Sequence, residues 1–143
     1  MNYLVDTNVV SELMRPQPND NVIDWFQDHE GCVYLSAITI KELYFGMLRL
    51  PEGKRKERLR EAITAIVMDC ADKTYAFDGF GGFICAHLHE AALAAGRPAT
   101  IEDLMIAAIC KRSDCVLATR NTKDFDYLGI EVVNPFEWNP RQN

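Results

Sequence analysis

Four acidic residues could act together as ligands of a divalent cation. They stand at or near the expected ends of strands and helices, and they are Asp6, Glu42, Asp103 and Asp124. Asp6 could instead cap the helix that follows it, and Glu42 could lie on an exposed helix face. Asp103 could simply favour a helix N-terminus electrostatically, and Asp124 could be a turn residue. Three of the four follow strand ends on one rim of the expected sheet, which favours a shared site.

Oxygen ligands of this kind predict a particular chemistry. Clustered carboxylates repel one another and raise each other's pKa unless a cation neutralises them. A ligand set without His or Cys suits a hard ion, Mg²⁺ or Mn²⁺. Such an ion can bridge a phosphodiester oxygen, promote deprotonation of water and stabilise the developing negative charge. The residue types therefore predict metal-dependent phosphodiester hydrolysis.

The elements that must position these acids alternate along the chain. Short apolar runs predict strands at residues 3–5, 33–35, 73–77, 115–118 and 130–133. Helical spacing of apolar residues is found at 9–14, 22–26, 38–48, 63–67, 78–95 and 101–112. Strands alternating with helices predict an α/β fold with a mainly parallel sheet and helices on both faces. At 143 residues, one domain is expected.

Charge and composition narrow the function classes. The net charge is −6, and neither half of the chain is basic, which argues against a conventional DNA- or RNA-binding module. The N-terminus lacks the basic region of a signal peptide, and no apolar stretch approaches the roughly 18 residues of a membrane span. Five cysteines without a CxxC pair suit reduced thiols. We therefore expect a cytoplasmic protein without a zinc site.

Residues 52–61 are dense in charges of both signs. Such a segment is typical of a solvated helix face with ion pairs four residues apart. A nucleic-acid contact is the alternative, although the interleaved glutamates weigh against it.

Four ordered motifs carry a family resemblance. They are Tyr3-Leu4-Val5-Asp6-Thr7-Asn8-Val9-Val10-Ser11-Glu12-Leu13; Leu35-Ser36 with Lys41-Glu42-Leu43 and Gly46; Glu102-Asp103-Leu104-Met105-Ile106-Ala107-Ala108; and Ala118-Thr119-Arg120-Asn121-Thr122-Lys123-Asp124-Phe125. Together they resemble PIN-domain toxins of the VapC type, including the FitB-like branch, over nearly the whole chain. The resemblance implies a single PIN domain over residues 1–143, with a three-layer α/β/α sandwich and a five-stranded parallel sheet. It also implies a Mg²⁺- or Mn²⁺-dependent endoribonuclease that forms a homodimer.

The resemblance also assigns roles to residues and partners. Asp6, Glu42 and Asp103 match three metal-site acids of the family. The fourth place falls on Asn121 in some members and on the acid before the Phe, here Asp124, in others; we assign Asp124. Supporting residues are expected at Thr7, Thr119 and Asn121, and Arg120 and Lys123 could either contact the RNA backbone or be ordinary surface charges. The implied partner is an antitoxin with a DNA-binding N-terminal part and a C-terminal segment that wraps the toxin and blocks its acidic pocket.

The working hypothesis is therefore an endoribonuclease toxin of a type II toxin–antitoxin pair. A rival from another class is a non-catalytic interaction module that serves as partner and co-repressor of a DNA-binding antitoxin. A response-regulator-like acidic pocket fits less well, because a receiver would want paired acids after its first strand and a lysine after its last.

Overall fold

Five short parallel strands form one sheet in the order β3-β2-β1-β4-β5 in the computed structural model, which describes residues 1–97 and 99–142. The strands are β1 (Asn2–Val5), β2 (Val33–Ser36), β3 (Thr74–Tyr75), β4 (Cys115–Ala118) and β5 (Val132–Val133). The first strand lies at the centre, between β2 and β4. Because all pairings are parallel, the carboxyl ends of the strands share one rim, where ligands of open α/β sheets bind.

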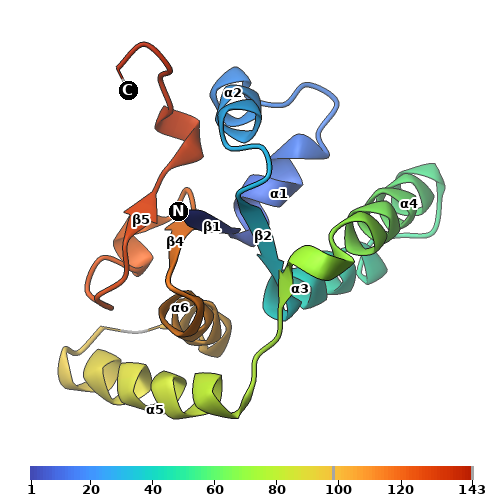
Figure 1. The fold of residues 1–143 in the computed structure, drawn as a ribbon. Coiled ribbons are helices and arrows are strands. Elements are labelled where there is room, and N and C mark those ends of the chain that lie inside the picture. The colour runs from blue at the N-terminus through green and yellow to red at the C-terminus, as the bar shows by residue number, and fades with distance from the viewer. Residues whose placement is uncertain (98, 143) are drawn as a thin grey trace.

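Helices connect the strands and cover both faces of the sheet (Figure 1). The α-helices are α1 (Thr7–Leu13), α2 (Asp20–Asp28), α3 (Ala37–Leu48), α4 (Lys54–Asp69), α5 (Gly79–Ala94) and α6 (Ile101–Ser113). Short 3₁₀ turns occur at η1 (Ala71–Lys73), η2 (Thr122–Asp124) and η3 (Pro135–Glu137). This arrangement confirms the expected three-layer α/β/α fold with a parallel five-stranded sheet.

Alternation along the central strands divides the core in two. Leu4 of β1 and its register partner Leu117 of β4 belong to a cluster with the apolar side chains of α5 and α6. The next pair, Val5 and Ala118, belongs to a second cluster with side chains of α1 to α4. Neighbouring strand residues point to opposite faces, so both faces of the sheet are buried. A fully buried aliphatic side chain such as Leu4 contributes about 1.5–3 kcal/mol.

Strands β5 and β3 are shorter than the sequence indicates. Residues 130–133 were expected to be extended, but β5 covers only Val132–Val133. Residues 73–77 were expected to be extended, but β3 covers only Thr74–Tyr75. The chain before it closes a 3₁₀ turn in which Lys73 N–H donates to the Cys70 carbonyl at 2.9 Å. Phe77, after the strand, packs against the α5–α6 cluster instead of extending the sheet. In the described residues no helix is long and apolar enough to span a membrane.

Candidate active site

Asp6 is the most constrained acid at the carboxyl rim of the sheet. It ends β1 and caps α1, because its Oδ1 accepts a hydrogen bond from the Thr7 main-chain N–H at 2.8 Å. Its Oδ2 accepts from the Thr119 hydroxyl at 2.8 Å and from the Asn8 side-chain amide at 3.2 Å. Burial raises the pKa of Asp6, while these hydrogen bonds lower it and the charge of Asp124 raises it further. The Asp6 side chain therefore caps α1 and also lies in the candidate acidic site.

Thr119 and Asn8 connect the ends of β1 and β4. The buried Thr119 hydroxyl also accepts from the Asn121 main-chain N–H at 3.1 Å and from the Asn8 amide at 3.3 Å. Asn8 Oδ1 in turn accepts the Arg120 main-chain N–H at 3.0 Å. The two strand ends are thus held together by side chains that also fix the Asp6 carboxylate.

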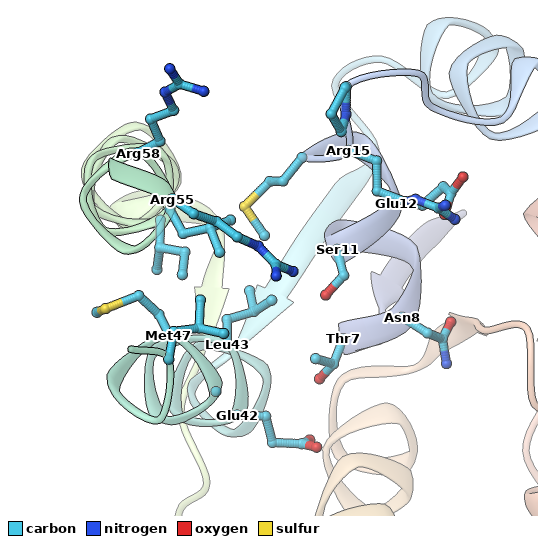
Figure 2. Close-up of a pocket in the computed structure, with 16 residues that line it drawn as sticks. Thr7, Asn8, Ser11, Glu12, Arg15, Glu42, Leu43, Met47, Arg55 and Arg58 are labelled. Carbon is cyan, nitrogen blue, oxygen red and sulfur yellow. The ribbon is translucent and has the colours of Figure 1, made fainter. Parts of the chain in front are cut away.

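Glu42 approaches this rim from α3. The helix begins directly after β2, and the Ser36 hydroxyl caps it by accepting the Thr39 N–H at 3.0 Å. The Glu42 carboxylate extends from α3 beneath Thr7 (Figure 2). Partial burial raises the pKa of Glu42 first, the negative charges of Asp6 and Asp103 raise it further, and the neighbouring Thr7 side chain lowers it.

Asp103 and Asp124 complete the acidic cluster from two other elements. Asp103 stands in the first turn of α6, where Thr100 caps the helix by accepting the Asp103 N–H at 3.1 Å. Burial raises the pKa of Asp103, and the charge of Asp6 adds to the effect. Asp124, exposed in η2, contributes further repulsion to both Asp6 and Asp103.

The charges of the three inner acids act on one another's pKa, and no protein cation in the described residues pairs with them. In the described ranges 1–97 and 99–142, none of Asp6, Glu42 and Asp103 forms an ion pair, whereas the neighbouring Glu102 pairs with Lys41 at 3.5 Å. Across the same ranges, no group of three or more acid, His or Cys side chains stands close enough together to hold a metal ion without moving. An open set of carboxylate oxygens fits Mg²⁺, which retains several waters and binds through one or two carboxylates.

The remaining predicted residues lie around this cluster in different ways. Thr7 supplies its main-chain N–H to Asp6, while its buried Oγ1 has no hydrogen-bond partner in the described part of the chain. Asn121 takes part through its main-chain N–H. The Arg120 guanidinium stacks over the Phe136 ring at 4.5 Å, and Lys123 is exposed.

The sequence profile of the PIN domain matches residues 3–130. This chain belongs to the PIN domain family. Plasmid stability protein StbB of Pseudomonas syringae pv. tomato is 38% identical, over 94% of this chain and 98% of that protein. Toxin FitB of Neisseria gonorrhoeae is 37% identical, over 93% and 97%. VapC ribonuclease Y4jK of Sinorhizobium fredii is 33% identical, over 94% and 97%.

Solved structures give the same answer for this PIN domain. A structure of FitAB bound to an IR36 DNA fragment superposes with a TM-score of 0.86 and 36% identity, covering 96% of this chain and 97% of that one. FitAcB from Neisseria gonorrhoeae also gives a TM-score of 0.86, with 38% identity over 94% and 99% of the two chains. The family and fold that the four motifs implied are thus confirmed.

A cleft in the PIN domain opens beside the acids. It has a volume of about 970 Å³, runs between α1, α3 and α4, and includes Thr7, Asn8 and Glu42 in its wall (Figure 2). Residues 54–61 of the charged segment form the start of α4. Lys56 and Glu52 form an ion pair with the expected spacing of four residues, while Arg60 and Glu57 pair at a spacing of three. Lys56 is buried, so this part of the helix is not the wholly solvated face that was expected.

Sequence reasoning missed two features of this region. Asn8 was not singled out, although its place two residues after Asp6 was the available signal, and its side chain joins both loops. Arg55 and Arg58 were treated only as part of a charged run, yet both line the cleft.

Proposed function

We propose that this PIN domain is a metal-dependent endoribonuclease and the toxin component of a type II toxin–antitoxin pair. The observation that carries the proposal is the group of mutually repelling acids at the rim, whose charges no protein cation balances within the described residues. Buried acids with raised pKa values are typical of functional sites. The ribonuclease relatives supply the reaction class.

The proposed metal ligands are Asp6, Glu42, Asp103 and Asp124, with Mg²⁺ or Mn²⁺ as the ion. When bound, the ion would neutralise the acids and polarise the scissile phosphodiester towards attack by water. Asp6 is held in one orientation by its three hydrogen bonds. Glu42 and Asp103 approach from separate helices, so they can adjust their spacing around an ion without straining the sheet.

Substrate and partner contacts follow from the same proposal. Arg120, steadied by Phe136, and the exposed Lys123 follow the Asp6 loop on the β4 side and would contact RNA phosphates. A cognate antitoxin would cover the acids and link the toxin to DNA, as the FitAB and VapBC structures bound to DNA suggest. We propose a homodimer that acts in the cytoplasm, where its RNA substrate would be.

The second candidate, a non-catalytic partner of a DNA-binding antitoxin, rests on those same DNA-bound complexes. It needs the dimer and the partner surface, but it does not need the acids. A substitution of Asp6 therefore distinguishes the two candidate functions.

The test is cleavage by the Asp6→Asn variant. We expect the purified wild type to cut single-stranded RNA with Mg²⁺ or Mn²⁺ and to stop when EDTA is added. Asp6→Asn should abolish metal-dependent cleavage, because the neutral amide removes one negative charge from the proposed ligand set of the cation. The variant should still fold, because Asn keeps the shape of the side chain and the Oδ1 acceptor for the Thr7 N–H, and circular dichroism checks this.

Asp72→Asn is the matched control, because Asp72 is an exposed aspartate in η1, away from the rim. It should cleave as the wild type does and arrest growth when expressed. Full cleavage by Asp6→Asn, in protein free of contaminating nuclease, would contradict the assignment. Growth arrest by Asp6→Asn would favour the non-catalytic candidate.

A further inference from the structure

The charged side chains that line the cleft beside the acids have a positive balance, whereas the whole chain has a negative net charge. Its charged lining residues are three arginines, Arg15, Arg55 and Arg58, and two glutamates, Glu12 and Glu42. The chain as a whole carries a net charge of −6. A local excess of arginine in an acidic protein indicates a surface that receives negative charge.

The positive charges of Arg55 and Arg58 are available to an incoming anion. Neighbouring cations on α4 are engaged, since Lys56 pairs with Glu52 and Arg60 with Glu57. Arg55 and Arg58 form no ion pair or side-chain hydrogen bond within the described residues. The Arg55 guanidinium reaches from α4 into the cleft towards Ser11, whereas Arg58 extends outward from the same helix (Figure 2).

The wall below the arginines is apolar. Leu43 and Met47 of α3 and Ile63 of α4 are buried side chains that line it. These side chains expose little surface, so they form the floor of the cleft, and the guanidinium groups of Arg55 and Arg58 are what it offers to the phosphates of a single strand.

We infer that this cleft holds the RNA strand on one side of the scissile phosphate, with Arg55 as its principal phosphate contact. The inference rests on the proposed ribonuclease function and names the path of its substrate. The Arg55 fork can bind a phosphate through two parallel N–H donors. Arg58 acts at the mouth of the cleft, and Arg15 contributes less because it is paired with Glu12 at 3.3 Å.

Continuity with the acids favours RNA over an acidic peptide as the occupant. Glu42, Thr7 and Asn8 lie in the cleft wall, so a strand in the cleft runs directly to the acidic cluster. A substrate cut at the acids must leave them along such a surface. An acidic peptide would also gain from the arginines, but it has no need of a path to the acids, whereas a strand that is to be cut must reach them.

The test measures RNA binding and cleavage separately. The probe is a fluorescein-labelled single-stranded RNA that contains a cleavage site mapped with the wild type. Binding is measured by anisotropy with Asp6→Asn protein, alone and combined with Arg55→Gln, over a series of NaCl concentrations. We expect Arg55→Gln to weaken binding about tenfold and to reduce the slope of log K against log[NaCl] by about 0.7, the value for one phosphate of a single strand.

Cleavage is measured in the otherwise wild-type chain. Arg55→Gln should raise KM about tenfold and leave kcat within about twofold, because the contact binds the ground state and the transition state alike. Arg55→Lys should give an intermediate loss, since it keeps the charge but not the fork. Arg49→Gln is the control: Arg49 is exposed at the end of α3 and does not line the cleft, so binding and KM should be unchanged.

The outcomes separate this inference from the proposed function. Absence of cleavage by the wild type would remove the proposed function itself. Normal cleavage with unchanged KM and salt slope in Arg55→Gln would overturn the cleft assignment alone. Loss of antitoxin binding in Arg55→Gln, with RNA binding unchanged, would also overturn it and assign the cleft to the protein partner.

Discussion

Replacing Thr119 by valine tests whether a hydrogen bond from its neutral hydroxyl stabilises the negative charge of Asp6 in the folded protein. Thr119 is fully buried, and its hydroxyl donates to Asp6 Oδ2 at 2.8 Å. Valine keeps the shape of the side chain and removes this donor, together with the acceptor of the Asn121 N–H and the Asn8 amide. Asn8 and Thr7 still bind Asp6, and the exposed Asn121 N–H can turn to water.

The expected loss follows from the type of bond. A hydrogen bond to a charged group contributes about 1.5–3 kcal/mol, more than one between neutral groups. We expect Thr119→Val to lower the free energy of unfolding of the metal-free protein by about 2 kcal/mol at neutral pH. For a chain of this size the unfolding temperature should fall by roughly 4–10 °C.

The pH dependence of the stability loss in Thr119→Val shows whether that loss comes from the charge of Asp6. Burial already raises the pKa of Asp6, and losing the Thr119 donor should raise that pKa further. The wild-type advantage is therefore fully present where Asp6 is ionised in both proteins. It should shrink as the pH falls through the raised pKa of Asp6 towards the ordinary value of 3.8, because a protonated Asp6 no longer needs a charge-stabilising donor.

Urea unfolding in EDTA at a series of pH values measures this difference. Thr119→Ser is the control, since it keeps the hydroxyl and should lose only about 0.5–1.5 kcal/mol of packing, with no pH dependence. The acidic limb of the cleavage rate should also move to higher pH in Thr119→Val alone. Equal stability losses at neutral and acidic pH would refute the reasoning.

Two further predictions concern Asp103 and the cap of α3. Asp103→Asn should stabilise the metal-free protein by about 0.5–2 kcal/mol at neutral pH, because burial and the Asp6 charge raise the pKa of Asp103. This gain should vanish at acidic pH, where Asp103 is protonated. A lower free energy of unfolding in urea at neutral pH would contradict the prediction. Ser36→Ala should cost about 1 kcal/mol and also lower kcat/KM, because Ser36 caps the helix that carries Glu42. Asn19→Ala, which removes the equivalent cap of α2, should cost similar stability and leave cleavage unchanged.

The sequence was sufficient for the parts of the fold that local pattern determines. An apolar run ending in Asp6 identified β1, and alternation of strands with helices required parallel pairing. The same pattern placed Asp6 and the segment after β4 at one rim. Helical spacing put Glu42 on the helix after β2 and Asp103 in the first turn of α6.

Contacts between segments that are far apart in the sequence could not be predicted from local patterns. Asn8 bonds the Thr119 hydroxyl and the Arg120 N–H, which lie 111 and 112 residues away, and this depends on β1 and β4 being neighbours. The roles within residues 52–61 depend on how α4 packs over α3. Packing buries Lys56 against the Leu48 carbonyl at 3.2 Å and turns Arg55 into the cleft, although the two residues are adjacent in sequence.

The donors around buried carboxylates distinguish a structural acid from one available for chemistry. Glu12 is also buried, but it binds the Asn19 N–H at 3.0 Å and pairs with Arg15, so its charge is balanced within the protein. Asp6 receives only neutral donors, which orient the carboxylate without cancelling its charge. An arginine in place of Thr119 would lower the raised pKa of Asp6 but would compete with any external cation. Neutral donors therefore suit an acid whose balancing charge must come from outside the chain.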